Sequence, residues 1–161
     1  MVSLIGCVSL IAAAVILCIY SNLYYEKKSE TYREIISFLY MAKQKMSCSS
    51  VMISTILDTA CEYQILDSCG FFLLAKDHGV ERAFYMTSGK LPLEANDKKR
   101  IGEFFGGFGE SMLSAEIENI SLCIDDLEQS YASLRSKLPD KKKVSSTMII
   151  CVTLLLIILI V

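Results

Sequence analysis

The side chains of this sequence that could act as nucleophiles or metal ligands are few and widely spaced. His78 is the single histidine, and four of the seven cysteines lie outside the apolar ends of the chain: Cys48, Cys61, Cys69 and Cys123. A thiol enzyme would need a base beside its cysteine, and His78 is the imidazole that could serve Cys61, Cys69 or Cys123. Zinc would need CxxC-type spacing, which these cysteines lack. We therefore expect a loop histidine and buried structural cysteines, with no catalytic residue, no metal ligand and no cofactor.

Glycines gather between Gly102 and Gly109, where a phosphate-binding loop is one interpretation. A Walker loop has a lysine and then a serine or threonine directly after its last glycine, whereas Gly107 is followed by Phe108. We expect Gly102, Gly106, Gly107 and Gly109 to let one helix approach another closely or to bend it. The phenylalanines nearby are predicted core residues, because no basic patch accompanies them. The net charge of −2 also argues against a nucleic-acid partner.

Acidic residues form the last group with a possible function, in this case the binding of a protein partner. Charged residues on an ordered helix can steer and orient a partner, but they are equally typical of a solvated helix face. Both interpretations stay open, and the predicted docking residues are Asp125, Asp126 and Glu128. The whole acidic stripe comprises Glu116, Glu118, Asp125, Asp126 and Glu128.

The distribution of charge along the chain indicates the elements that carry these residues. Of the 161 residues, 53% are hydrophobic and 21% are charged, and all 16 basic and 18 acidic residues lie between Glu26 and Lys143. An ordinary soluble domain has about a quarter of its residues charged, without long uncharged ends. This pattern excludes a simple soluble enzyme, a secreted disulfide scaffold and a disordered tail.

Each uncharged end is long enough to cross a bilayer. As a helix, Val2–Tyr20 would extend about 28 Å, close to the thickness of the hydrocarbon core. No basic residue precedes it and no small-x-small cleavage site follows it, so we predict a retained anchor rather than a signal peptide. Val144–Val161 is apolar on all sides, and the middle of the chain is too small to enclose it as a core helix. The sequence therefore predicts two transmembrane helices.

Basic residues beside these spans predict the orientation of the chain. By the positive-inside rule, the middle segment that carries them lies in the cytoplasm. The odd number of irregularly spaced cysteines also suits a reducing compartment. The predicted parts are an N-terminal transmembrane helix at residues 1–25, a cytoplasmic helical bundle at 26–143 and a C-terminal transmembrane helix at 144–161. The basic residues concerned are Lys27, Lys28, Arg33, Arg135, Lys137, Lys141, Lys142 and Lys143.

Two long amphipathic helices are predicted next to the spans, and packed antiparallel they would bring both spans to the same side. The first has apolar residues three and four apart at Tyr32, Ile35, Leu39, Ala42 and Met46. The second has an unbroken heptad pattern, which Pro139 is expected to end. Its apolar residues are Leu113, Ile117, Ile120, Ile124, Leu127, Tyr131, Leu134 and Leu138.

Shorter helices are predicted between the two long ones. Capping residues and glycines suggest their limits. The expected fold is all-α, with a cytoplasmic bundle of about six helices between two transmembrane helices. The short helices are expected at about 51–60 behind a cap at Ser49 or Ser50, at 71–75 between Gly70 and Gly79, at 80–86, and from a cap at Asn96 or Asp97 to Phe108.

This layout resembles the stage III sporulation protein AB family, and the likeness is strongest over Lys99–Val161. The family's run of phenylalanine and glycine is similar to Phe104–Gly109, and its following helix, rich in leucine and acidic residues, is similar to Ile120–Glu128. The early helix over Thr31–Met46 also has the family's pattern. The chain departs from that pattern at Met46–Ser50, which replaces a Tyr-Gly turn and a proline, and at Met112 and Glu116, which replace Asp and Gln.

The resemblance implies a role that the residues alone do not indicate. The family is similar to the inner-membrane platform proteins of type II secretion and type IV pilus machines, which have a six-helix cytoplasmic domain. It implies a non-enzymatic subunit of a complex that connects mother cell and forespore and is needed for endospore formation. The implied partners are a cytosolic secretion-type ATPase and other sporulation membrane subunits. The implied location is the mother-cell membrane around the forespore, and a homo-oligomer is compatible with the family.

Two other functions remain open on the sequence. One is a generic two-span membrane adaptor that oligomerises through its heptad helices. The other is a membrane-bound thiol enzyme that would use Cys61 or Cys69 with His78.

Overall fold

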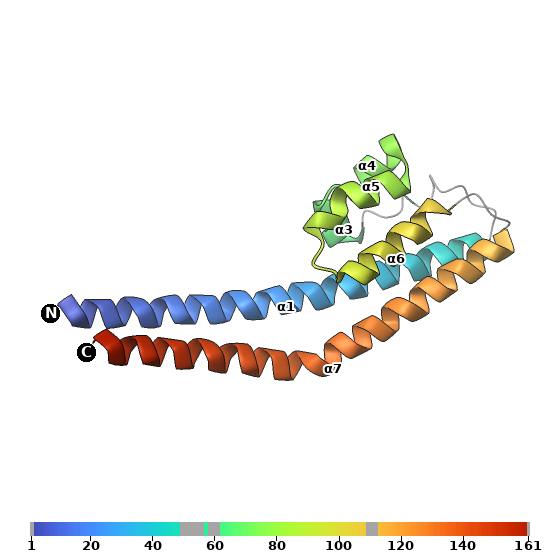
Figure 1. Ribbon diagram of the computed structural model, residues 1–161. Helices are drawn as coiled ribbons and strands as arrows, with labels where there is room; N and C mark the ends of the chain where they lie inside the picture. Colours follow the sequence, from blue (N-terminus) through green and yellow to red (C-terminus); the bar gives the residue numbers. More distant parts are fainter. Residues whose placement is uncertain (1, 49–56, 58–61, 109–112, 161) are drawn as a thin grey trace. The chain divides into compact units, whose positions relative to one another are not determined.

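The computed structural model describes residues 2–48, 57, 62–108 and 113–160, and these residues form helices without any strand (Figure 1). The predicted all-α fold is therefore confirmed. The helix predicted at 51–60 lies outside the described residues, apart from Leu57, which is buried. The elements are α1 (Val2–Cys48), α3 (Gln64–Ser68), α4 (Phe71–His78), α5 (Val80–Thr87), the short 3₁₀ helix η2 (Ser88–Lys90), α6 (Ala95–Gly106) and α7 (Leu113–Ile160).

The chain divides into two compact units, and α1 and α7 belong to both. The hairpin unit contains Met1–Lys27 and Leu134–Val161, and the helical core unit contains Lys28–Ser133. These units are defined by contacts inside the chain, whereas the predicted boundaries concern a bilayer. The division into residues 1–25, 26–143 and 144–161 therefore stays a prediction.

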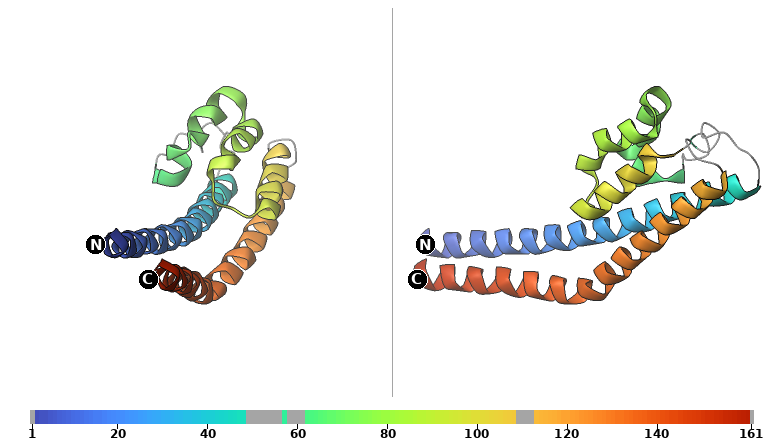
Figure 2. Two further views of the ribbon diagram at one scale, coloured as in Figure 1. Left: turned by 60° about the vertical axis from the view of Figure 1, so that its left-hand side comes forward. Right: turned by 45° about the vertical axis from the view of Figure 1, so that its right-hand side comes forward.

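In the hairpin unit the first part of α1 and the last part of α7 lie side by side and antiparallel (Figures 1 and 2). The hydroxyls of Ser21 and Ser145 form a hydrogen bond of 2.9 Å. The ammonium of Lys142 donates to the Glu26 carboxylate at 2.8 Å. Polar pairs at this level of the hairpin fix the register of the two helices, because a slip of one residue would separate both pairs.

The expected break in the C-terminal helix at Pro139 is wrong. Pro139 lies inside α7, which continues to Ile160. A proline within a helix removes one backbone hydrogen bond and crowds the carbonyl four residues earlier. Here that loss falls in a helix of 48 residues, where the helical bonds on both sides remain. The seam of half-buried side chains also continues beyond the proline, from Leu138 before it to Lys142, Ser145, Ile149 and Thr153 after it.

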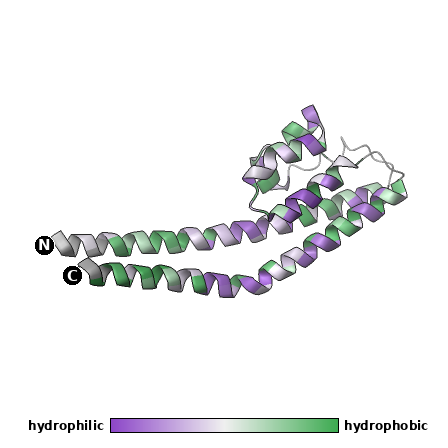
Figure 3. Cartoon of the chain, viewed as in Figure 1, coloured by the Kyte–Doolittle hydropathy of each residue, from purple (hydrophilic) through white to green (hydrophobic). Residues whose placement is uncertain are grey.

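Hydropathy along the chain agrees with a membrane-associated N-terminal helix. Among the described residues, Ser9–Ser47 contains a stretch apolar enough for a membrane span by length and composition, and 6% of that stretch is buried. A core helix of a soluble protein would be mostly buried instead. Figure 3 shows hydrophobic colouring over the outer parts of both long helices. Within the described part of 144–161 the same criterion does not find the second span, which stays a prediction.

The core of the helical core unit follows the predicted seams. On α1 all five predicted positions are buried, from Tyr32 to Met46. On α7 the central positions Ile120, Ile124 and Leu127 of this unit are buried, Ile117 and Tyr131 are half-buried, and Leu113 at the start is 45% exposed. Each such buried side chain contributes roughly 1.5–3 kcal/mol relative to an exposed one, so the two seams supply much of the stability of this unit.

Phenylalanines complete the core, and of those predicted beside the glycine run Phe105 is buried, whereas Phe104 and Phe108 are half-buried. Phe38 of α1 lies 6.3 Å from Phe71 and 5.7 Å from Phe72 between ring centres. Phe105 of α6 lies 5.7 Å from Phe71 and 5.5 Å from Phe84. These tilted and edge-to-face contacts between rings are the arrangement that aromatic quadrupoles favour.

Two features fix the ends of the short helices: glycines with positive φ and a carboxylate that accepts backbone hydrogen bonds. Gly70 and Gly79 have a backbone φ of 84°, which a residue with a Cβ adopts at a cost, and they bracket α4 as predicted. The Glu34 carboxylate accepts hydrogen bonds from the backbone N–H groups of Ile65 and Leu66 at 2.7 and 2.8 Å. A side chain of α1 therefore satisfies the free donors at the start of α3.

Candidate docking site

A buried polar network joins three helices beneath the candidate site. The Asp97 carboxylate on α6 accepts a hydrogen bond from the Tyr32 hydroxyl on α1 and a second from the Ser130 hydroxyl on α7 at 3.0 Å. The backbone N–H of Glu94 donates to the Tyr32 oxygen at 3.3 Å. Burial, and next the bond to Asp97, raises the pKa of Tyr32 well above its usual range. The hydroxyl therefore stays protonated and keeps donating at neutral pH.

The expected cap of α6 by Asn96 or Asp97 is wrong. The residue at the N-cap position is Glu94, and its side chain makes no capping bond. Asp97 is 4% exposed and turns into the core, because Tyr32 and Ser130 offer it two hydroxyl donors. An aspartate can serve as a helix cap or as a buried hydrogen-bond acceptor, and the sequence alone does not distinguish these two roles.

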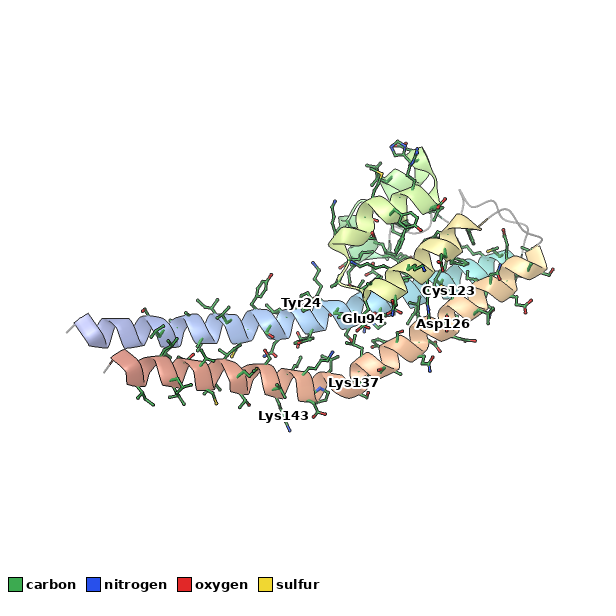
Figure 4. The ribbon with its side chains drawn as sticks, in the orientation of Figure 1. Tyr24, Glu94, Cys123, Asp126, Lys137 and Lys143 are labelled. Atoms are coloured by element: carbon green, nitrogen blue, oxygen red, sulfur yellow. The ribbon has the colours of Figure 1, made fainter. Side chains whose placement is uncertain are left out.

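The three predicted docking residues do not share one environment. Asp125 is exposed. Asp126 forms an ion pair with Arg100 of α6 at 3.1 Å, with each side chain about half exposed. Glu128 accepts a hydrogen bond from the Tyr40 hydroxyl of α1 at 2.9 Å, and this bond raises the pKa of Tyr40. Figure 4 shows Asp126 and Cys123 on the side of α7 that faces α6.

One residue of the predicted acidic stripe is buried. Glu116 is 8% exposed, so its carboxylate is not available to a partner as the sequence suggested. It lies one residue before the heptad position Ile117, on the side of α7 that packs into the core. Burial of this position is a tertiary effect that the charge pattern did not reveal.

A different set of residues forms one continuous exposed surface on α7. Residues three and four apart lie on the same side of a helix, and Glu118, Leu122 and Asp125 have that spacing. All three are exposed, and Leu122 is 59% exposed. Glu128 continues the row at its edge. We call these four residues the acidic face of α7. Leu122 was missed in the sequence analysis, although its position off the heptad seam between two acidic residues was the available signal.

An open groove runs beside the acidic face. It has a volume of about 360 Å³ and lies between α6 and α7, with Leu122 on its edge. Arg100, Phe104 and Asp126 also line it. A partner side chain placed against Leu122 could therefore extend into a groove with both apolar and charged walls.

Of the groups that could have supported chemistry, Cys69 and Cys123 are buried and His78 is exposed. Cys69 is buried and its thiol donates to the Leu66 carbonyl. Burial raises the pKa of Cys123 to about 12, which keeps that sulfur as a thiol at neutral pH. His78 is exposed at the end of α4, and Cys61 lies outside the described residues. Among the residues described, no three histidine, cysteine or acidic side chains gather as a metal site would require.

The glycines of α6 allow close helix packing, as predicted. A Cβ at Gly102 would lie 2.8 Å from the Tyr85 hydroxyl oxygen, and one at Gly106 would lie 3.3 Å from a Glu81 carboxylate oxygen. Glu81 and Tyr85 are four residues apart on α5, as Gly102 and Gly106 are on α6. A ridge of α5 thus fits a groove of α6. Gly107 has open space around it, and Gly109 is not described.

Comparison with known proteins identifies the family of the chain. A family model for stage III sporulation protein AB matches residues 3–161. No curated protein and no solved structure matches the chain significantly. The match covers both long helices, the short helices between them and the acidic face of α7. The chain therefore belongs to the stage III sporulation protein AB family.

Proposed function

We propose that the chain is a non-enzymatic platform subunit of a secretion-like complex that acts in endospore formation. In this proposal two transmembrane helices hold it in the mother-cell membrane around the forespore, with the middle segment in the cytoplasm. The acidic face of α7 docks a cytosolic secretion-type ATPase. Family membership gives the role in sporulation. The platform role, the location and the ATPase partner follow from the resemblance, and the two spans, their orientation and the docking face are argued from the residues.

The observation that carries the docking proposal is the exposure of Leu122. An apolar side chain that is 59% exposed, with carboxylates at Glu118 and Asp125 on either side, has the composition of a small protein-binding patch. Such patches combine an apolar contact, which loses its water on binding, with a charged rim that sets orientation.

Side-chain contacts connect the helix beneath this face to its neighbours. Asp126 is paired with Arg100 of α6, and Glu128 accepts from Tyr40 of α1. Further inside, Asp97 binds Ser130 of α7. Three side-chain contacts thus fix α7 against its neighbours, so a partner that binds the acidic face meets an ordered surface and loses less entropy on binding.

The chemistry of the face defines the partner surface. It should present basic residues around an apolar side chain or shallow pocket, because Glu118, Asp125 and Glu128 carry negative charge at neutral pH. Long-range attraction between the two surfaces would speed association and weaken as salt is added. Asp126 contributes indirectly in this arrangement, through its ion pair with Arg100.

The test is a pull-down of the secretion-type ATPase by the full-length chain at low and high salt. We expect Glu118→Lys with Asp125→Lys to reduce binding about tenfold or more at low salt, and Leu122→Ser to reduce it at both salt concentrations. These positions are preferred to Asp126 and Glu128, whose replacement would also break contacts inside the chain. The matched control, Glu62→Lys with Asp77→Lys, reverses two exposed charges elsewhere and should bind normally.

Two results would contradict the docking proposal. One is equal binding by the Glu118/Asp125 variant, the control and the unchanged chain. The other is binding that all variants lose together, which would indicate an effect of net charge rather than of this face.

The alternative, an adaptor that oligomerises through its heptads, is less well supported. The central seam residues Ile124 and Leu127 are each 1% exposed within a single chain. A second copy could reach them only if the helical core unit opened. We therefore favour docking through the exposed face over self-association through the seams.

A further inference from the structure

We propose that an anionic phospholipid of the cytoplasmic leaflet binds along one exposed stripe of α7 in the hairpin unit. The stripe consists of Lys137, Lys141, Val144, Met148 and Leu155, and we call it the lysine stripe. The inference rests on the proposed membrane insertion of this part of the chain, and it adds a ligand that the platform function does not itself require.

Spacing places these residues on one side of the helix. They follow one another at intervals of 4, 3, 4 and 7 residues, which is the recurrence that keeps side chains on a single helical face. All five are exposed, with Val144 at 59% and Met148 and Leu155 at 67% each. The seam toward α1 uses other positions, such as Lys142 and Ser145, which bond to Glu26 and Ser21. The lysine stripe is therefore unoccupied by the hairpin contact.

The order of residue types along the stripe matches the order of groups in a phospholipid. Two lysines come first, and apolar side chains follow without interruption by charge. From Val144 to Leu155 the helix rises about 16 Å, which is about half of a 30 Å hydrocarbon core. A lipid whose phosphate lies at Lys137 and Lys141 would thus run its acyl chains along Val144, Met148 and Leu155 through one leaflet.

Charge decides which lipid fits. Lysine donates three hydrogen bonds and carries a full positive charge, and Lys137 and Lys141 lie one helical turn apart, so one phosphate can contact both. Asp140 is the nearby acidic group, one residue from Lys141, and it favours a monoanionic headgroup over a more highly charged one. Other basic residues of this stretch, Arg135 and Lys143, lie on different sides of the helix. Figure 4 shows the Lys143 side chain directed away from α1.

The experiment measures lipid retained by the full-length chain. The protein is placed in nanodiscs of phosphatidylcholine with a minor share of phosphatidylglycerol, extracted in mild detergent and analysed by mass spectrometry for bound lipid. We expect enrichment of phosphatidylglycerol over its share in the disc. Each basic residue near an anionic surface contributes about 1 kcal/mol, a factor of about 5. Lys137→Gln with Lys141→Gln should therefore lower the retained phosphatidylglycerol by about tenfold or more.

The matched control removes two positive charges from the same stretch but from other sides of α7, as Arg135→Gln with Lys143→Gln. This control should keep most of the phosphatidylglycerol. Equal loss in the two variants would overturn the proposal, because it would mean that charge near the membrane acts diffusely. No enrichment in the unchanged chain would overturn it as well.

Two competing ligands test whether the site binds a whole lipid or only a phosphate group. Inorganic phosphate and glycerol phosphate, added at millimolar concentration, should leave the bound phosphatidylglycerol in place, because they lack the acyl chains that contact Val144 and Met148. Displacement by either would assign the site to a free phosphate instead. Failure of the membrane insertion itself is detected separately, by whether alkaline carbonate releases the chain from membranes, so a failed lipid site and a failed insertion are distinguishable.

Discussion

Tyr32 of α1 and Asp97 of α6 meet in the core of the helical core unit, where the phenol hydroxyl donates to the carboxylate. Tyr32 is 1% exposed and Asp97 is 4% exposed. Because Asp97 also accepts from Ser130 of α7, one carboxylate connects the two long helices through α6. The Tyr32 ring also stacks on Tyr131 at 6.5 Å between ring centres.

Replacement of Tyr32 by phenylalanine should therefore destabilise the fold by about 1–3 kcal/mol, because a buried carboxylate loses a hydrogen bond. The pH dependence has a definite sign. The folded pKa of Tyr32 is raised above the unfolded value of 10.0, so its contribution is present below pH 10 and is lost as the pH rises above it. Thermal unfolding of the full chain in detergent, from pH 8 to pH 11, should show a steeper loss in the unchanged chain than in Tyr32→Phe. Parallel pH profiles would contradict this assignment. Tyr40→Phe is the control. The pKa of Tyr40 is also raised by a carboxylate, that of Glu128, but this bond lies at the surface, so its loss should change the pH profile less than the loss of the buried Tyr32 bond.

The heptad seam of α7 gives a second prediction. Ile124 is 1% exposed, and Leu122 on the same helix is 59% exposed. An aspartate at position 124 would bury an unpaired charge, so Ile124→Asp should cost several kcal/mol and lower the unfolding midpoint or cause aggregation. Leu122→Asp places the same residue at an exposed position and should change stability by about 0.5 kcal/mol or less. Equal melting curves for the two variants would mean that the seam is not buried.

The packing of α5 on α6 gives a third prediction. Alanine in place of glycine within a helix gains up to about 1 kcal/mol. At Gly106, the last residue of α6, the new Cβ lies 3.3 Å from the flexible Glu81 carboxylate, so Gly106→Ala should stabilise the chain by less than this interior value. At Gly102 the Cβ lies 2.8 Å from the Tyr85 oxygen, so Tyr85 must move and Gly102→Ala should gain little or nothing.

A double change tests the cause of that difference. In a Tyr85→Ala background the obstruction is absent, and Gly102→Ala should then recover most of the gain from helix propensity. Denaturant unfolding of the four chains gives the coupling free energy between positions 85 and 102. A coupling near zero would show that the close approach has no energetic effect.

Orientation in the membrane is the fourth prediction. Buried Cys69 and Cys123 would resist a labelling reagent in either orientation, so we place new cysteines at exposed sites of the helical core unit. Leu73 is 70% exposed, and Leu73→Cys should react with an impermeant maleimide only after the cells are lysed. A control cysteine on a protein known to face outward confirms that the reagent works in intact cells. Labelling of Leu73→Cys before lysis would contradict a cytoplasmic middle segment.

Pairing of the two apolar segments is the fifth prediction. The hydroxyl oxygens of Ser21 and Ser145 lie 2.9 Å apart, a distance that suits replacement by a disulfide. Ser21→Cys with Ser145→Cys, in a chain whose other cysteines are replaced, should form an intramolecular crosslink under mild oxidation in membranes. Ser21→Cys with Met148→Cys should not, since Met148 is 67% exposed and lies about one helical turn beyond Ser145. Crosslinks between two chains, rather than within one, would indicate that the segments pair between copies.

The amino-acid sequence by itself determined the helical class, the two seams and the family. Apolar residues at 3- and 4-residue intervals leave a helix one face to bury, so Leu39 and Ile124 could be assigned to the core before any contact was known. Glycines at positions 70 and 79 likewise predicted the ends of α4, because a positive φ favours a residue without a Cβ.

Only the tertiary structure decided which polar residues are buried and which partners they bind. Asp97 has the residue type of a helix cap, yet Tyr32, 65 positions away in the sequence, draws it into the core. Glu116 and Asp125 look alike in the acidic stripe, but one is buried and the other is exposed. The sequence also suggested that Pro139 would end α7, although the helix continues through it. Hydrogen bonds and ion pairs depend on which distant groups come within about 3 Å, and a periodic pattern along one helix does not contain that information.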